Sequence, residues 1–168
     1  NGIFYFNQEY MENYLDDYIV EEDTRLLASL TFDDGPSKYT KELLDLLDEY
    51  KIKATFFVVG KESDADKDAL RRIVDAGHTL GMHSYSHRYS EIYASVENFA
   101  ADFEKLQNYL YEVTGVESTV YRFPGGSSNG VSKICPGLMT RLTEQIPKMG
   151  YQYFDWNVSS GDTSTKIT

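Results

Sequence analysis

The chain has 168 residues, of which 41% are hydrophobic, and this suits one domain with its own core rather than a disordered segment. Its formal net charge of −11 argues against a nucleic-acid-binding surface, which needs clustered lysine and arginine, and against an anionic membrane surface. No stretch is long and apolar enough to cross a bilayer, and the first residues lack the pattern of a signal peptide or anchor.

An acidic, tyrosine-rich segment opens the chain. Residues 1–24 show neither helical nor strand periodicity, and we interpret them as an N-terminal extension of a domain that spans 25–168. Regular patterns begin at Leu26. The apolar run 26–32 predicts a buried strand, stopped by the turn residues Asp33-Asp34-Gly35-Pro36.

Strand and helix patterns then alternate along the domain. Further strands are predicted over 54–59, 79–82, 120–123 and 151–158. Apolar residues recur at helical spacing within 43–50, 69–74, 96–110 and 138–149. Such an order implies parallel strands covered by helices, and both a closed barrel and an open doubly wound sheet fit it. Either fold gathers functional groups at the carboxyl ends of its strands.

Two histidines stand four residues apart, directly after the predicted strand 79–82. His83 and His87 can face the same way on a tight turn, which is the arrangement that a metal ion needs. A lone pair at this spacing is more often solvent-facing, but here one carboxylate would complete a three-ligand site. Either Asp33 or Asp34 can supply it. Three protein ligands and an open position are typical of a catalytic metal.

The adjacent carboxylates Asp33 and Asp34 directly follow an apolar strand. A turn explains one of them and the Gly-Pro pair that follows. Two neighbouring like charges repel each other, so the pair suggests that the two carboxylates have different roles. A metal could bind one of them while the other serves as a base.

The segment Arg122-Phe123-Pro124-Gly125-Gly126 follows another predicted strand. One interpretation is a surface arginine before a Pro-Gly turn. The functional interpretation is that Arg122 pairs with an active-site carboxylate, while the glycine backbone N–H groups approach a substrate and form an oxyanion site.

Together, these three motifs resemble those of polysaccharide deacetylases with a NodB homology domain, carbohydrate esterase family 4. The resemblance covers about residues 25–165 and includes the strand 54–60. It implies an α/β fold, a distorted (β/α) barrel, and a divalent metal, usually zinc, bound by Asp34, His83 and His87.

The resemblance also implies roles for four further residues. Asp33 would be the general base, held by Arg122, and the backbone N–H of Gly125 would help to bind the oxyanion. Asp162 would tune a general-acid histidine. Because family members usually carry an aromatic residue in place of Gly125, we expect a more open acetyl pocket on this side. His78 is not a ligand in such enzymes, and we interpret it as structural.

The last motif of the family, a Leu-x-His segment on a later strand, is absent. All three histidines lie at positions 78, 83 and 87, so none remains as general acid. We interpret the domain 25–168 as C-terminally incomplete, lacking its last strand and histidine motif. An inactive domain is the alternative.

The resemblance implies a hydrolase that removes N-acetyl groups from a glycan, with peptidoglycan N-acetylglucosamine as the first choice. Its place would be extracellular or in the bacterial cell envelope. An acetyl-xylan esterase on the same fold, and an inactive metal-binding module that binds glycan, are the alternatives. We expect a glycan partner, no nucleic acid and no membrane insertion by this segment. The sequence indicates no oligomeric state.

Overall fold

The computed structural model describes residues 2–4 and 28–161 of the chain, so most of the predicted extension 1–24 lies outside the described residues. The described elements are, in chain order, β1 (Gly2–Phe4), β2 (Ser29–Gly35), α2 (Thr40–Glu49), β3 (Thr55–Val59), α3 (Asp64–Asp75), β4 (Thr79–Ser84), α4 (Tyr89–Ile92), α5 (Val96–Thr114), β5 (Val120–Tyr121), the 3₁₀ helix η1 (Val131–Ile134), α6 (Leu138–Lys148), β6 (Gln152–Tyr153) and β7 (Val158–Ser159).

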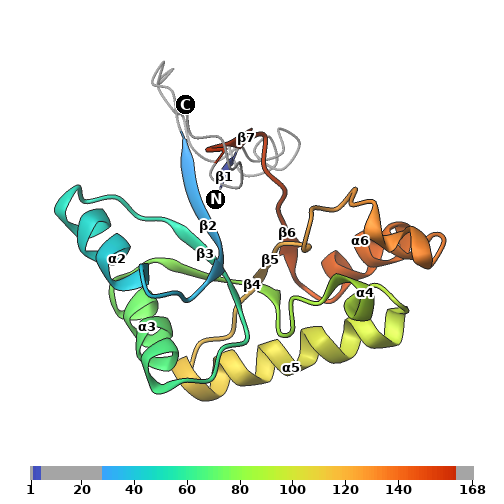
Figure 1. The fold of residues 1–168 in the computed structure, drawn as a ribbon, viewed down its shortest axis with the longest axis horizontal. Coiled ribbons are helices and arrows are strands. Elements are labelled where there is room, and N and C mark those ends of the chain that lie inside the picture. The colour runs from blue at the N-terminus through green and yellow to red at the C-terminus, as the bar shows by residue number, and fades with distance from the viewer. Residues whose placement is uncertain (1, 5–27, 162–168) are drawn as a thin grey trace, which may run out of the picture.

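The strands form one sheet in the order β6-β5-β4-β3-β2-β1-β7. From β2 to β6 every neighbouring pair is parallel, whereas β1 is antiparallel to both β2 and β7. Strands that follow one another in the chain are therefore neighbours in space. Figure 1 shows α2, α3, α5 and α6 around the outside of the strands, as expected when successive parallel strands are joined by crossovers of one hand.

This strand order decides between the two architectures that the sequence leaves open. A doubly wound sheet reverses its strand order at a switch point, and β2 to β6 contain no reversal. The predicted α/β fold with the winding of a (β/α) barrel is confirmed. The carboxyl ends of β2 to β6 consequently lie along one edge of the sheet.

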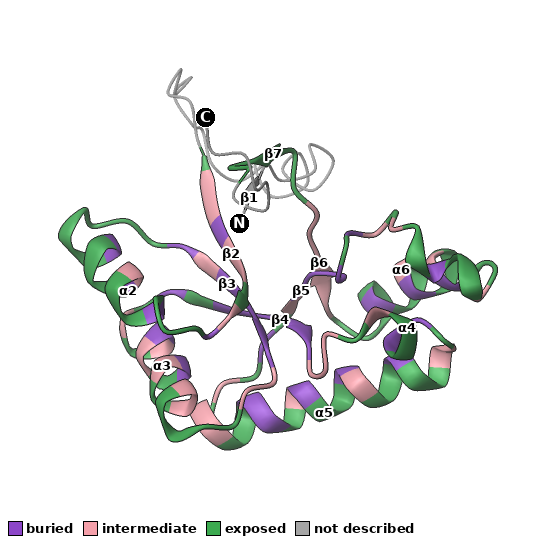
Figure 2. Ribbon diagram, viewed as in Figure 1, coloured by how far each residue is buried: buried purple, intermediate pink, exposed green. Residues whose placement is uncertain are grey.

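The hydrophobic core fills the space between the sheet and its helices. Helix α5 presents Phe99, Phe103, Leu106 and Leu110 to it, at helical spacing, and all four are buried. Burying each such side chain away from water contributes about 1.5–3 kcal/mol to the stability of the folded state. Figure 2 shows buried residues along the strands and on the sides of the helices that face them. The core thus fixes the strands whose ends carry the polar motifs.

Strand β2 runs further than its apolar residues predict. It continues through the two aspartates to Gly35, and its pairing with β3 is irregular between Asp33 and Gly35. Asp34 adopts a φ of 65° at this irregularity. Successive side chains of a regular strand point to opposite faces, and the irregularity interrupts that alternation. The predicted turn at Asp33 is therefore wrong, because backbone pairing with β3 does not depend on side-chain polarity.

Other boundaries also differ from the predictions. Strand β4 extends through His83 to Ser84, and the predicted strand 151–158 is in fact the two short strands β6 and β7. The short elements β1, α4 and η1 have no counterpart among the predictions. Each is too short to show a hydrophobic period.

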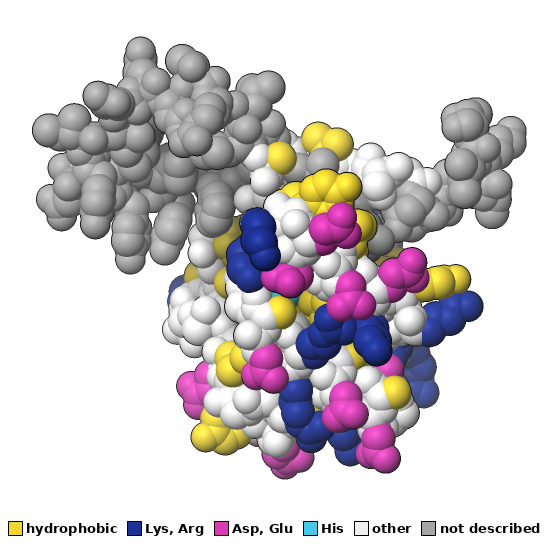
Figure 3. Space-filling view, turned by 90° about the vertical axis from the view of Figure 1, so that its left-hand side faces the viewer, with side chains coloured by type: hydrophobic (Ala, Val, Ile, Leu, Met, Phe, Trp, Pro, Cys, Tyr) yellow, Lys and Arg dark blue, Asp and Glu magenta, His cyan; other side chains and the backbone are white. Residues whose placement is uncertain are grey.

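The face formed by α2 and α3 carries charges of both signs. Arg71 contacts Asp68 at 2.8 Å within α3, and Arg72 bridges to Asp45 on α2. Figure 3 shows acidic and basic side chains interspersed over this face. The described helices include none that is long and apolar enough to span a membrane.

Candidate metal centre

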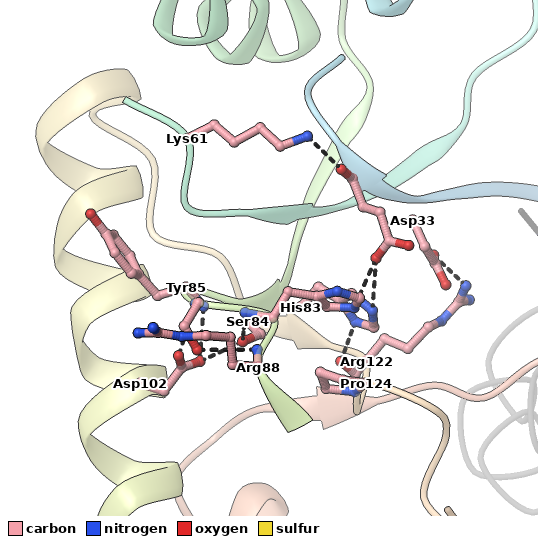
Figure 4. Close-up of polar contacts among 12 residues, drawn as sticks. Asp33, Lys61, His83, Ser84, Tyr85, Arg88, Asp102, Arg122 and Pro124 are labelled. Carbon is pink, nitrogen blue, oxygen red and sulfur yellow. Dashed lines mark hydrogen bonds and ion pairs between the residues drawn. The ribbon is translucent and has the colours of Figure 1, made fainter. Parts of the chain in front are cut away.

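The polar motifs meet at the carboxyl ends of β2, β4 and β5. Asp33 and Asp34 belong to the end of β2, His83 lies near the end of β4, and Arg122 directly follows β5. His87 follows β4 by three residues. Figure 4 shows His83, Asp33 and Arg122 converging from these strands. The structure therefore brings together residues that lie up to 89 positions apart in the sequence.

Asp34, His83 and His87 offer three ligand atoms that lie within 4.8 Å of one another. Oδ1 of Asp34 is 3.4 Å from Nε2 of His83 and 3.1 Å from Nε2 of His87. The imidazole rings are 5.2 Å apart between centroids. One carboxylate and two imidazoles at this separation form a donor set that suits zinc and related divalent ions.

The hydrogen bonds of the two imidazoles test whether a metal fits. Nδ1 of His83 lies 2.7 Å from the carbonyl oxygen of Arg122, and because a carbonyl only accepts, Nδ1 carries the proton. The lone pair of His83 Nε2 then faces the cluster. Nε2 of His87 is shielded from solvent and makes no hydrogen bond among the described residues. The residues present fit a divalent metal.

Asp34 is held in its charged form. Contacts with the imidazole of His83, and then with that of His87, keep the pKa of the Asp34 carboxyl well below its usual range, although burial opposes this effect. The carboxylate is therefore available to a cation without a proton having to be removed.

Two of the three candidate ligands have left-handed backbone, with φ values of 65° at Asp34 and 52° at His87. Non-glycine residues adopt this conformation at a cost, and it persists where the surroundings enforce it. Lys61, just after β3, donates from Nζ to the carbonyl oxygens of Asp34 at 3.1 Å and Pro36 at 2.6 Å. The N–H of His87 donates to Oγ of Ser84 at 2.9 Å. These contacts hold both strained positions.

Arg122 is fully buried and fixes Asp33. Its Nη1 lies 2.6 Å from Oδ1 of Asp33 and donates to Oγ1 of Thr31 at 3.1 Å, while Nε donates to the carbonyl oxygen of Phe154 at 3.2 Å. The guanidinium also stacks over the ring of Phe57, 4.1 Å from its centroid. Burial lowers the pKa of Arg122, and the contact with Asp33 opposes that shift. Asp33 is thereby placed beside Asp34 but outside the candidate ligand set.

Gly125 lies in the turn after β5 with a φ of 77°. A Cβ added there would come within 3.1 Å of Cε2 of Tyr89. The same tyrosine ring packs edge-on against His87 at 5.2 Å between centroids. The space beside Gly125 therefore holds an aromatic ring from α4, so this side of the site is less open than the sequence suggests.

Two residues named in the sequence analysis lie elsewhere. Asp162 is outside the described residues. His78 precedes β4, at the other end of that strand from His83. It is buried, and its Nδ1 accepts a hydrogen bond from the N–H of Ala54 at 3.2 Å. These contacts support the structural interpretation of His78.

Sequence reasoning missed three residues that shape the site: Lys61, Tyr89 and Asp102. Asp102 lies on α5 and bonds the segment between the two histidines. None belongs to a recognisable motif, and each acts on residues that are distant in the chain or belong to another element. No local signal was available to find them.

Comparison with known proteins gives consistent matches over this region. The family model described as polysaccharide deacetylase matches residues 21–135. A peptidoglycan-N-acetylglucosamine deacetylase of Bacillus cereus is 35% identical over 138 residues, covering 82% of this chain and 48% of that protein. Chitin deacetylase 1 of Cryptococcus neoformans is 28% identical over 150 residues, covering 85% of this chain and 32% of that protein.

Solved structures match as well. The catalytic domain of a peptidoglycan N-acetylglucosamine deacetylase from Eubacterium rectale superposes with a TM-score of 0.79 at 48% sequence identity, covering 83% of this chain and 64% of that chain. The chain spans about half the length of the first curated relatives that it matches.

Proposed function

The chain belongs to the polysaccharide deacetylase family, and from this premise we propose that it takes part in hydrolysing the N-acetyl groups of a polysaccharide. The observation that carries the proposal is the candidate ligand set Asp34, His83 and His87, with Asp33 beside it in an ion pair with a buried arginine. Peptidoglycan N-acetylglucosamine is the proposed substrate, in line with the Bacillus cereus and Eubacterium rectale relatives.

The candidate ligands and Asp33 have separate proposed roles in the reaction. A divalent metal held by Asp34, His83 and His87, with Zn²⁺ as the proposed ion, would polarise the acetyl carbonyl and acidify a water molecule. Asp33 then accepts the proton of the attacking water as general base. Its contact with Arg122 holds the carboxylate in one position beside the candidate ligands.

The turn after β5 is proposed to stabilise the charge that develops on the carbonyl oxygen. The backbone N–H of Gly125 is the donor, and one such donor typically contributes about 3–4 kcal/mol to transition-state stabilisation. Asp155, which follows β6, supports this turn, since its Oδ1 accepts from the N–H of Ser127 at 2.8 Å.

The departing amine must also receive a proton. His78 cannot supply it, because it lies at the far end of β4 from His83 and bonds to Ala54. We therefore propose that the donor lies outside the described residues and that Asp162 tunes it. An ester leaves as an alkoxide and needs less help from an acid. An acetyl-xylan esterase is for this reason the second candidate.

The proposed substrate places the protein outside the cell or in the bacterial cell envelope. No nucleic acid is proposed as a partner, since the described face over α2 and α3 mixes both charges rather than gathering basic residues.

Acetate release by the full gene product that contains this chain tests the proposal. The protein is stripped of metal, reloaded with Zn²⁺, and given peptidoglycan, N-acetylglucosamine oligomers or acetylated xylan. We expect Zn²⁺-dependent acetate release from the first two. Asp33→Asn should lower kcat about 10²–10⁴-fold with Zn²⁺ affinity retained, because it removes the base and leaves the ligands in place.

Three outcomes would contradict the proposal. Acetate release that survives complete removal of the metal would exclude the metal centre. Activity on acetylated xylan alone would favour the esterase. Glycan binding without any release of acetate would indicate a binding module.

A further inference from the structure

The carboxylate of Asp102, on helix α5, lies under the segment that joins the two histidines. Oδ2 of Asp102 accepts from Oγ of Ser84 at 2.7 Å and from the N–H of Tyr85 at 2.8 Å. Oδ1 accepts from the N–H of Ser86 at 2.9 Å. Figure 4 shows Asp102 pointing from α5 toward Ser84 and Tyr85. One side chain thus engages every residue between His83 and His87.

A continuous chain of hydrogen bonds connects this carboxylate to a candidate ligand. The N–H of His87 donates to Oγ of Ser84, and the hydroxyl of Ser84 donates to Asp102. Hydrogen bonds in such chains polarise and strengthen one another, and those to a carboxylate are stronger than neutral ones. His87 needs this support because its φ of 52° is unfavourable for a residue with a side chain.

The opposite end of the segment is fixed independently. Ser84 is the last residue of β4 and is almost fully buried, and His83 is anchored through Nδ1 to Arg122. What Asp102 controls is therefore the position of His87 relative to His83. That relation decides whether two imidazole nitrogens and one carboxylate can reach the same ion.

We propose that Asp102 is a positioning residue that holds the segment 84–87 in its metal-binding shape before any metal arrives. The proposal rests on the metal site of the proposed function and extends it to helix α5. It assigns to α5 a second task beside packing against the sheet. Groups that orient metal ligands typically change affinity about 10–100-fold when they are mutated.

Asp102→Asn tests the proposal with almost no change in shape. One acceptor oxygen becomes an NH₂ group that faces backbone donors, so at least one of the three hydrogen bonds is lost. The control is Glu104→Gln, which removes the same charge from an exposed position on the same helix. Both variants of the full gene product are titrated with Zn²⁺ alone against a chelating dye, at a temperature where each is folded.

We expect Asp102→Asn to weaken Zn²⁺ binding tenfold or more, with Glu104→Gln within twofold of the parent. Ser84→Ala cuts the bond to His87 and should weaken binding too. The double variant should lose less than the product of the two single effects, because both break one chain. Unchanged affinity in folded Asp102→Asn would overturn the proposal. If that variant does not fold, the same outcome for Ser84→Ala overturns it.

Amide hydrogen exchange on the metal-free protein supplies a second readout. The N–H groups of Tyr85, Ser86 and His87 should exchange faster in Asp102→Asn than in the parent and in Glu104→Gln. Exchange that stays slow at these three amides would also overturn the proposal. This measurement separates two failures, since a parent protein that binds no Zn²⁺ contradicts the proposed function while the exchange result still decides the role of Asp102.

Discussion

Arg122 contacts both a candidate metal ligand, His83, and the proposed base, Asp33, and it uses a different group for each. Its carbonyl oxygen accepts from His83, while its guanidinium binds Asp33. A substitution at this position changes only the second contact. Metal binding and proton transfer should therefore respond separately when the side chain is replaced.

We expect Arg122→Met to lower kcat about 100-fold or more while Zn²⁺ affinity stays within a few-fold of the parent. Breaking the ion pair between Arg122 and Asp33 should also cost about 3–5 kcal/mol of stability, because one member of a largely buried ion pair is removed. Arg122→Lys keeps the charge and provides a less disruptive companion variant. Kinetics, Zn²⁺ titration and urea unfolding measure the three quantities. Loss of Zn²⁺ binding by a folded Arg122→Met protein would contradict this division of roles.

Gly125 combines a left-handed backbone with a close neighbour, the ring of Tyr89. Gly125→Ala should therefore destabilise the protein by more than the roughly 1–2 kcal/mol that the left-handed conformation alone costs. Gly115→Ala is a matched control, with a φ of 72° and nothing within 4 Å of an added Cβ. Thermal unfolding should rank Gly125→Ala below Gly115→Ala.

The cause of that difference is also testable. Adding Tyr89→Ala to Gly125→Ala removes the ring 3.1 Å from the new methyl group but leaves Cβ of Asn129 at 3.2 Å, so the effect of Gly125→Ala should shrink part of the way toward that of the control. If the two glycine variants lose equal stability, the ring is not the obstacle.

The sequence identifies the single residues whose side chains have a strong chemical signature. It names Asp33, Asp34, His83, His87 and Arg122, and the structure brings all five together. It does not name the residues that orient them. Lys61 reaches Asp34 across 27 positions and Asp102 reaches Ser84 across 18, so their partners are set by the fold rather than by local sequence.

Helices and strands are predictable where a hydrophobic period is long enough to recognise. The apolar face of α5 and the buried run of β3 both give clear patterns. The ends of β2 and β4 do not, because the candidate ligands Asp34 and His83 continue the strands with polar side chains. The predicted ends of these two strands are therefore wrong at the residues where the candidate site begins.

His78 links the starts of β3 and β4, and we expect it to make the stability of the fold depend on pH. Burial is the largest cause that lowers the pKa of His78 from its usual 6.5, followed by the charge of Lys53. The folded state therefore disfavours the protonated ring. The contribution of His78 to stability is fully present above its pKa in the unfolded chain, 6.5. It is lost as the pH falls from 6.5 toward the lower pKa that His78 has in the folded protein.

His78→Asn keeps an acceptor for Ala54 but cannot titrate, so it should lose less stability between neutral and mildly acidic pH than the parent does. Urea unfolding of both proteins with a chelator present measures the difference without interference from bound metal. An equal loss in the two proteins would show that other groups cause the dependence.

For the whole molecule, the strand order has a simple consequence for function. Because β2, β3, β4 and β5 are neighbours in chain order, motifs separated by many residues arrive at one edge of the sheet. A metal bound by the candidate ligands would join β2 to His83 on β4 and to His87 after it. Because unfolding would separate these ligands, we expect metal binding to stabilise the fold.

A Zn²⁺ concentration of 100 times Kd should raise the free energy of unfolding by about 2.7 kcal/mol. Thermal unfolding with Zn²⁺, and with a chelator in its place, measures this effect. His87→Ala removes one ligand and should abolish most of the difference. A full Zn²⁺ effect in His87→Ala would mean that the ion binds elsewhere.

The left-handed backbone at Asp34 and His87 restricts what can replace these residues. Aspartate, asparagine and histidine tolerate that conformation better than other side chains, whereas β-branched residues scarcely adopt it. Coordination chemistry and chain geometry thus select the same few amino acids at both places. A homologue with asparagine at either position could keep the same backbone conformation even if it no longer bound a metal. Valine or isoleucine at either position would require a different backbone conformation.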